Sequence, residues 1–167
     1  GGKKMIAAYE APDRSPLYAA PRPYALSQAH KHLKEMKAVA GLENAPAFLP
    51  VVGDFYSGML VTVMLHAAQL APGYGLEDVK ACLRNAFPGP VVRCAEDSTE
   101  AGFLSAAALA GTDGMEISVY GNEERMTLCA RFDNLGKGAS GAAVQCMNLA
   151  LGCPQMQGLT IQGGNIT

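Results

Sequence analysis

The sequence predicts an α+β fold, with one mixed or antiparallel sheet flanked by helices. The expected elements follow the order helix, strands, helix, strands, helix, which is typical of this class. The β-branched residues at 61–63 indicate a strand, and the apolar spacing from Leu76 to Phe87 indicates an amphipathic helix. A chain of 167 residues is long enough to bury a core.

Two short helices are expected in the first part of the chain. One covers 3–10, and a second with helical spacing covers 31–40, where Gly41 can form the C-terminal cap. Between them, four prolines within 12–23 predict an ordered loop.

Five segments are predicted as strands. The segments 47–52 and 60–66 are rich in apolar and β-branched residues, and 91–94 is a short strand. The segments 115–120 and 126–132 are expected to form a β-hairpin around Gly121 and Asn122.

A helix over 76–87 and a final helix over 137–151 complete the predicted elements. The alanine-rich segment 105–110 fits either a helix or a strand. The uncharged, glycine-bearing segment 152–167 is expected to be a flexible tail.

Composition excludes several classes of protein. The net charge of −2 and the pI near 5.9 give no basic stripe for nucleic acid. No apolar run reaches the 18 residues of a membrane span, and no secretory leader opens the chain. A cytoplasmic enzyme is therefore expected.

The cysteines fit neither a zinc site nor a disulfide framework, because they are odd in number and widely spaced. We expect reduced, mostly buried thiols. The five positions are Cys82, Cys94, Cys129, Cys146 and Cys153.

The strongest chemical motif is His30-Lys31-His32-x-x-Glu35. On a helix, Glu35 lies three residues after His32 and shares its face. Two imidazoles and a carboxylate could supply a general base and a site for an anionic substrate. The spacing alone slightly favours a solvated helix with incidental histidines. No metal site is predicted, because no third ligand has a characteristic spacing.

The segment 132–149 is the most informative stretch of the chain. A loop that contains Asn134 and Lys137 leads into a helix of small residues over 138–143, which allows close approach of a backbone or a flat ligand. Two glycines there cost roughly 0.8–1.0 kcal/mol each relative to alanine. Packing on a cofactor domain is one compensation, and a tightly packed helix without a ligand is equally compatible.

Lys3 and Lys4 follow Gly1-Gly2 at the start of a helix. Free N–H groups and the helix dipole favour an anion at such a position. An ordinary exposed lysine pair is an equally good interpretation.

The motif Asp133-Asn134-Leu135, with Lys137-Gly138-Ala139 and Gly141-x-x-Val144-Gln145, resembles the C-terminal segment of semialdehyde-forming acyl-phosphate reductases. Two branches share this segment: N-acetyl-gamma-glutamyl-phosphate reductases and aspartate-semialdehyde dehydrogenases. The motifs at 1–6, 29–36 and 52–61 resemble the first branch, and the His-x-His spacing is absent from the second.

The resemblance implies a role for each motif. His30 would act as acid and base beside a nucleophilic cysteine, while His32 and Glu35 would hold the substrate. Asn134 and Lys137 would face the nicotinamide of NADP. The turn that bears Lys3 and Lys4 would line the substrate site, and these lysines could compensate for the absence of a basic residue in 55–58.

The resemblance also implies that parts of the catalytic apparatus lie elsewhere. None of the five cysteines has the sequence context of the nucleophile, and no glycine-rich dinucleotide turn follows a first strand. The chain, which begins without methionine, resembles a piece of a larger polypeptide that would be inactive in isolation.

The implied fold is a C-terminal domain of the glyceraldehyde-3-phosphate dehydrogenase kind. Residues 1–132 would form the substrate and dimerisation domain, 133–151 a helix packed on a missing cofactor domain, and 152–167 the tail. The expected partners are a small acyl phosphate and further copies of the chain.

Two alternatives stay open. The chain could be a non-catalytic dimerisation module, or a relative of aspartate-semialdehyde dehydrogenase or of a lysine-pathway acyl-phosphate reductase.

Overall fold

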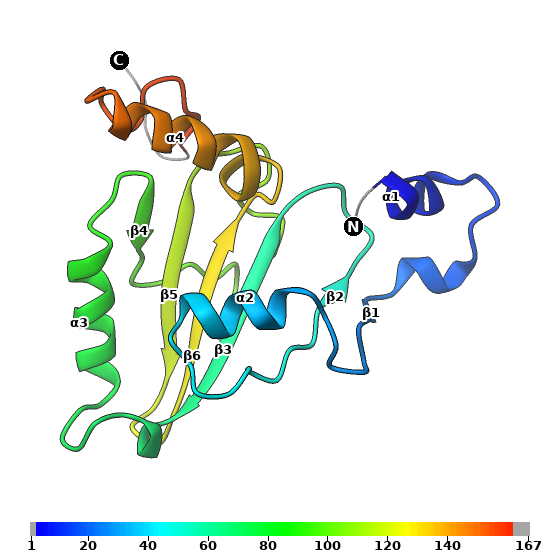
Figure 1. Cartoon of the computed structure of the whole chain (residues 1–167). Helices are drawn as coiled ribbons and strands as arrows, with labels where there is room; N and C mark the ends of the chain where they lie inside the picture. Colours follow the sequence, from blue (N-terminus) through cyan, green and yellow to red (C-terminus); the bar gives the residue numbers. More distant parts are fainter. Residues whose placement is uncertain (1–2, 162–167) are drawn as a thin grey trace. The chain divides into compact units, whose positions relative to one another are not determined.

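The structure is a computed structural model that describes residues 3–161. It divides into two compact units, residues 1–55 and 56–167, which we call the N-terminal unit and the sheet unit. Figure 1 labels their helices and strands. The domain boundaries expected from the resemblance, and the packing of 133–151 on a cofactor domain, stay predictions.

The N-terminal unit contains both predicted helices. Gly41, just after the second helix, has the left-handed φ of +63° that favours glycine at such an end. The prolines between the helices accompany a 3₁₀ turn and a short strand rather than an uninterrupted loop. The elements are α1 (Lys3–Glu10), the 3₁₀ turn (Pro16–Ala19), β1 (Arg22–Pro23), α2 (His32–Val39) and β2 (Val51–Val52).

The strand predicted for 47–52 forms a regular ladder only at its last two residues. β2 pairs antiparallel with β1, and the Tyr24 N–H extends this pairing to the Pro50 carbonyl at 2.9 Å. Pro50 has no N–H to donate, which explains why the ladder stops there. Beyond it, the Gln28 side chain acts as the pairing partner, since its amide donates to the Phe48 carbonyl and accepts from the Phe48 N–H, both at 2.8 Å.

The sheet unit holds a four-stranded mixed sheet, which confirms the predicted fold class. The strands lie in the order β3-β6-β5-β4, with β4 parallel to β5 and the other neighbours antiparallel (Figure 1). The elements are β3 (Met59–His66), α3 (Leu76–Ala86), β4 (Val92–Cys94), β5 (Met115–Gly121), β6 (Arg125–Phe132) and α4 (Gly141–Ala150).

The hairpin of β5 and β6 forms as predicted. Gly121 has a φ of +132°, and an added Cβ would lie 2.1 Å from the Arg125 carbonyl oxygen, so only glycine fits. Asn122 closes the turn, because its Oδ1 accepts the N–H groups of Glu124 and Arg125, both at 2.9 Å.

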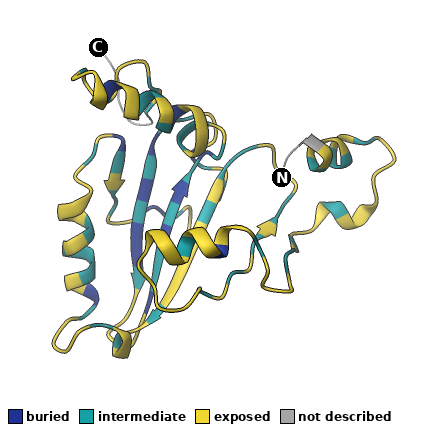
Figure 2. Ribbon diagram, viewed as in Figure 1, coloured by how far each residue is buried: buried dark blue, intermediate teal, exposed yellow. Residues whose placement is uncertain are grey.

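The apolar core lies between α3 and one face of the sheet. Leu76, Val119 and Met126 are buried there, and Val79 and Leu83 extend the apolar face of α3 toward them. Figure 2 shows the buried residues concentrated on β5 and β6. The helical spacing of apolar residues after position 76 therefore correctly predicted which side of α3 is buried.

The opposite face carries a row of charges across three strands. The register places Arg93 beside Glu116 and Glu116 beside Arg131. Glu116 is 8% exposed and Arg131 6%. Arg131 donates to Glu116 at 2.9 Å and to Glu100 at 2.6 Å, and Arg93 donates to the other Glu116 oxygen. Burial acts to raise the pKa of Glu116, but the two arginines outweigh it, so that this pKa is lowered.

The segment between β4 and β5 forms turns over 106–111, so 105–110 is neither a helix nor a strand. Its Ser98 N–H donates to the Tyr120 hydroxyl at 2.9 Å. Gly58 packs against the turns at 106–107 so closely that an added Cβ would lie 2.3 Å from the Ala106 carbonyl oxygen.

Asp133, directly after β6, is the most highly connected carboxylate of the sheet unit. It is 2% exposed and accepts hydrogen bonds from the Ser57 hydroxyl and from the N–H groups of Gly111, Leu135 and Gly136. Burial acts to raise its pKa, but these four donors outweigh it, so that this pKa is lowered. One side chain thereby joins the approach to β3, the turns before β5 and the start of the last helix.

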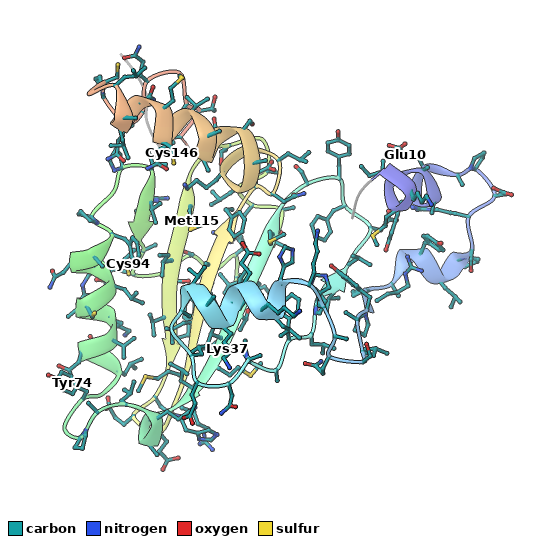
Figure 3. All side chains as sticks on the ribbon, in the orientation of Figure 1. Glu10, Lys37, Tyr74, Cys94, Met115 and Cys146 are labelled. Atoms are coloured by element: carbon teal, nitrogen blue, oxygen red, sulfur yellow. The ribbon has the colours of Figure 1, made fainter. Side chains whose placement is uncertain are left out.

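The expectation of mostly buried cysteines was wrong, although all five are free thiols. Only Cys129 is buried, and burial raises its pKa. Cys82 and Cys146 are exposed, on α3 and α4, and Cys94 on β4 is half-buried (Figure 3). A small side chain is tolerated on an outer helix face as well as in a core, so composition alone did not separate the two cases.

Across residues 3–161, each helix is too short or too polar to cross a membrane.

Replacing Arg131 tests the buried charge row. Arg131→Met should lower the free energy of unfolding by about 3–5 kcal/mol, because Glu116 loses one of its two cationic partners while staying buried. Urea denaturation measures this change. Arg84→Met is the matched control: its ion pair with Glu96 is exposed, so the loss should stay below about 1 kcal/mol. Equal losses in the two variants would contradict the arrangement.

The pH dependence of stability tests Asp133. Its folded pKa lies below the unfolded value of about 3.9. The stabilisation is therefore complete above that unfolded value and is lost as the pH falls through the folded pKa. Asp133→Asn should lower the free energy of unfolding at neutral pH by about 3 kcal/mol, since buried N–H donors lose an acceptor. Its unfolding free energy should also vary less than that of the wild type as the pH falls below the unfolded value and through the folded pKa. Parallel curves would contradict the role of Asp133.

Candidate functional site

The histidine motif lies at the start of α2 in the N-terminal unit, and its residues come together as predicted. His32 Nδ1 and Glu35 Oε2 are 2.9 Å apart, across one helical turn. Both side chains are open to solvent, with exposed fractions of 47% and 68%. The pair leaves the second ring nitrogen of His32 and the second carboxylate oxygen of Glu35 for other contacts.

His30 is more enclosed than His32. Its ring packs edge-on between Phe48 at 5.3 Å and Tyr24 at 6.0 Å, measured between ring centroids, and is tilted against the His32 ring at 4.9 Å. The side chain is half-buried. Aromatic neighbours restrict the ring to one orientation, which a solvated helix face would not do.

One nitrogen of His30 is already engaged. Its Nδ1 accepts the N–H of His32 at 3.3 Å, one of the N–H groups that a helix start leaves without an intrahelical partner. This contact favours the neutral tautomer that carries its proton on Nε2. Nε2 is therefore the nitrogen of His30 that can exchange a proton with a bound molecule.

Sequence reasoning missed the residues that position His30. Tyr24 lies at the end of the β1–β2 pairing, and Phe48 is fixed through its backbone by Gln28. In the structure, even-numbered residues from 46 to 52 are half-buried and odd-numbered ones exposed. The sequence gives no such signal, because this segment consists of two prolines and five apolar residues.

Lys4 is exposed on α1, at the start of the N-terminal unit. Gly1, Gly2 and the side chain of Lys3 lie outside the described residues. The anion site expected for Lys3 and Lys4 at this helix start stays a prediction.

Asn134 and Lys137 belong to the sheet unit, and both engage neighbours in the chain. Asn134 Oδ1 accepts the Gly58 N–H at 2.8 Å, and Lys137 Nζ donates to Gln145 at 2.8 Å. Asn134 therefore fixes the loop before β3, and its amide nitrogen offers two N–H donors for a ligand. The nicotinamide-facing role of the two residues stays a prediction.

The helix predicted for 137–151 begins with one π-helical turn over Gly136–Ser140 and continues as α4. Close contacts within the sheet unit leave no space for a side chain at two of the glycines in this segment. An added Cβ at Gly136 would lie 2.2 Å from the Thr112 carbonyl oxygen, and one at Gly141 would lie 2.2 Å from Asp113 Oδ1. Of the two glycines in 138–143, Gly141 is thus required by Asp113, and an added Cβ at Gly138 would lie 3.2 Å from the Asp133 carbonyl oxygen. Close packing within the unit is therefore present, and packing on a cofactor domain stays a prediction.

Met147 and Leu149 are exposed on α4, on different sides of the helix because they are two residues apart. The segment after it makes specific contacts: Asn148 donates to the carbonyl of Gln157 at 2.8 Å, and Asp113 Oδ2 accepts the N–H of Thr160 at 2.9 Å. Flexibility of 152–167 stays a prediction, and residues 162–167 lie outside the described part.

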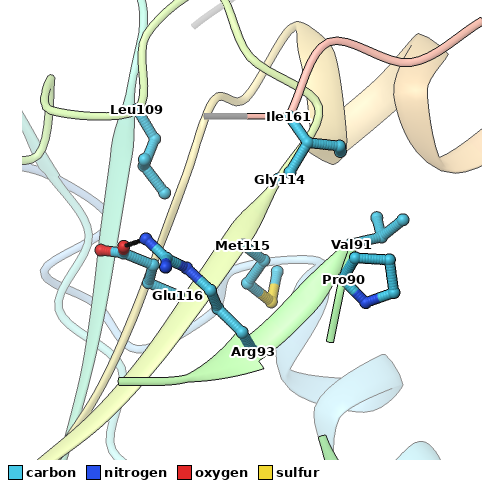
Figure 4. Close-up of a pocket in the computed structure, with 8 residues that line it drawn as sticks. All are labelled: Pro90, Val91, Arg93, Leu109, Gly114, Met115, Glu116 and Ile161. Atoms are coloured by element: carbon cyan, nitrogen blue, oxygen red, sulfur yellow. Dashed lines mark hydrogen bonds and ion pairs between the residues drawn. The ribbon is translucent and has the colours of Figure 1, made fainter. Parts of the chain in front are cut away.

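A pocket on the sheet unit is too small for a substrate. Its volume is about 10 Å³, the space of about one water, whereas small-molecule sites measure roughly 300–1,000 Å³. Figure 4 shows the Arg93–Glu116 pair beside it. The lining residues are Pro90, Val91, Arg93, Leu109, Gly114, Met115, Glu116 and Ile161. Within the described residues, the histidine cluster of the N-terminal unit is the better candidate site.

Comparison with known proteins gives relatives that share one name, N-acetyl-gamma-glutamyl-phosphate reductase. The protein from Sinorhizobium fredii (strain NBRC 101917 / NGR234) is 44% identical over 155 residues, which cover 90% of this chain and 50% of the relative. Those from Rhizobium etli (strain CIAT 652) and Rhizobium meliloti (strain 1021) are 44% and 42% identical, each over 90% of this chain and 51% of the relative. The chain spans about half the length of these curated relatives.

The family model described as "Semialdehyde dehydrogenase, dimerisation domain" matches residues 1–134, most of the chain. The resemblance drawn from the histidine and Asp-Asn motifs is thereby confirmed. The chain belongs to the semialdehyde dehydrogenase dimerisation domain family.

Proposed function

We propose that this chain is the substrate-binding portion of an N-acetyl-gamma-glutamyl-phosphate reductase, which converts an acyl phosphate into a semialdehyde in arginine biosynthesis. The observation that carries the proposal is the oriented His30 ring, with Nε2 as its exchangeable nitrogen, beside the His32–Glu35 pair. The names of relatives 42–44% identical over 90% of the chain support the same activity.

The nucleophilic cysteine and the main cofactor site belong, in this proposal, to a portion that corresponds to the other half of the relatives. NADP would supply the hydride when bound there. Within this chain, His30 Nε2 exchanges a proton with the reacting centre, and His32 and Glu35 hold the polar groups of the substrate. The amide nitrogen of Asn134 is the group that fits a contact with the nicotinamide, since its oxygen already binds Gly58.

Two exposed apolar side chains of α4 support a contact with the cofactor-binding portion. Met147 and Leu149 are more than half exposed, although large apolar side chains favour burial. We propose that α4 makes this contact. We also propose that the complete enzyme is cytoplasmic.

A second role, assembly, is favoured by β3. Met59, Val61 and Val63 lie on the face of β3 that continues the apolar side of the sheet, and all three are exposed. β3 is also an edge strand with an unpaired outer edge within the described sheet. A homo-oligomer that covers this strand agrees with the description of the family as a dimerisation domain. No observation favours the aspartate-semialdehyde or lysine-pathway alternatives.

A chimeric enzyme tests the proposed activity. This chain is joined to the unmatched half of the Sinorhizobium fredii relative, in the order of that protein, and reduction of the acyl phosphate is followed by NADPH oxidation. The chimera should turn over, and His30→Asn should lower kcat by about 10²–10⁴-fold, the usual contribution of a general acid–base. The asparagine oxygen can still accept the His32 N–H, so the helix start is preserved.

His66→Asn is the matched control, because His66 is exposed at the end of β3 and outside the proposed site. It should keep the activity of the chimera. A folded chimera without turnover would contradict the proposed function. A His30→Asn variant with more than about a tenth of the parent kcat would contradict the role of His30.

Light scattering of the chimera tests assembly. A homo-oligomer is expected, and Val63→Glu should shift it toward the monomer, because a buried charge opposes association through β3. Val39→Glu, at a strongly exposed position of α2, is the control and should leave the mass unchanged. A Val63→Glu protein with the parent mass would contradict the proposed surface.

A further inference from the structure

Arg22 occupies an unusual position on β1 of the N-terminal unit. Its guanidinium carbon lies 3.8 Å from the centroid of the Tyr18 ring and 5.2 Å from that of Tyr9, and the two rings are themselves in edge contact at 4.9 Å. The two rings stabilise the cation and restrict the plane of the guanidinium. Arg22 is therefore held in one orientation without help from an acidic residue.

The charge of Arg22 is unmatched in the described part of the chain. Each of the other five arginines forms an ion pair with a carboxylate, whereas Arg22 has none within 4.0 Å. Its Nε is also buried without an acceptor. An arginine offers five N–H donors, and a buried donor without an acceptor costs free energy. Nε thus has no acceptor within the described chain, and the guanidinium has no carboxylate partner there.

Arg22 lies on the same face of the β1–β2 pairing as the histidine site. Residues two apart in a strand point to the same side, so Arg22 and Tyr24 share a face, roughly 7 Å apart along the strand. Burial agrees, since both are half-buried while Pro23 between them is exposed. The Tyr24 ring is the one that lies 6.0 Å from His30.

The charge balance of the unit also favours an anionic ligand. Residues 1–55 contain seven basic and five acidic residues, whereas 56–167 contain six and ten. Two of the five carboxylates are already engaged, Asp54 by Arg14 and Glu35 by His32. Arg14 is neutralised by a two-pronged pair with Asp54, so it does not compete for the ligand.

We propose that Arg22 is the oxyanion-binding residue of the site, where its guanidinium pairs with a carboxylate or phosphate of the substrate while His30 faces the reacting centre. The planar donor set matches either group in a two-pronged geometry. Stacking on Tyr9 and Tyr18 orients the donors before the ligand arrives, which limits the entropy lost on binding. The inference rests on the proposed function, because it assigns recognition of that reaction's substrate.

Kinetics of Arg22 variants in the chimera test this assignment. Arg22→Gln should raise KM for the acyl phosphate about 10- to 100-fold, the loss expected for a charge-assisted contact, with kcat changed less than about threefold. Arg22→Lys keeps the charge but not the planar donors, so its KM should lie between those of the parent and of Arg22→Gln. Arg84→Gln, an exposed arginine of α3 that pairs with Glu96, is the control and should match the parent.

Binding of two probes identifies the group that Arg22 contacts. Calorimetric titration with inorganic phosphate and with N-acetylglutamate should show weaker binding of one probe to Arg22→Gln. Loss of phosphate binding assigns the phosphate, and loss of N-acetylglutamate binding assigns the carboxylate. An inactive chimera would contradict the proposed function alone, because the titrations still test Arg22.

Two outcomes would overturn the assignment. Binding of both probes and KM could stay unchanged in Arg22→Gln, or the variant could lower only the unfolding temperature and kcat. The second result would mean that the stack of Arg22 with Tyr9 and Tyr18 merely holds α1 and the following turn together. Thermal unfolding of the same variants separates this structural role from binding.

Discussion

The sheet unit depends on one carboxylate, that of Asp133. Its two oxygens accept four hydrogen bonds from segments that are distant in sequence: the approach to β3, the turns before β5 and the turn that opens the last helix. The adjacent Asn134 adds a fifth contact through Gly58. Because β3 and β5 flank β6 on either side, a single dipeptide after β6 fixes how both neighbours begin.

The two units use charge in opposite ways. In the sheet unit, Arg93, Glu116 and Arg131 neutralise one another across three strands, and this cluster contributes to structure. In the N-terminal unit, His30 and Arg22 keep donors that no carboxylate of the described chain satisfies. The proposed site therefore lies in the unit with the shorter elements, and binding residues often lie on such loop-rich segments.

Sequence patterns predicted the elements whose stability is local or periodic. The α3 helix, the β5–β6 hairpin and the one-turn spacing of His32 and Glu35 follow from side-chain periodicity and turn chemistry. The surroundings of His30 could not be predicted in this way, because Phe48 reaches it through a long-range contact made by the Gln28 side chain. The buried charge row was equally invisible, since alternating charged residues in a strand usually indicate a solvated face.

The side-chain amide of Gln28 binds the backbone N–H and carbonyl of Phe48 in the place of a strand partner. A backbone ladder opens residue by residue, whereas these two hydrogen bonds belong to one amide group and break together. The Gln28 amide therefore holds the loop that bears His30 through a single two-bond contact. The loop that bears His30, the ring proposed as acid and base, is thus held to the Phe48 segment by one side chain rather than by the β1–β2 ladder.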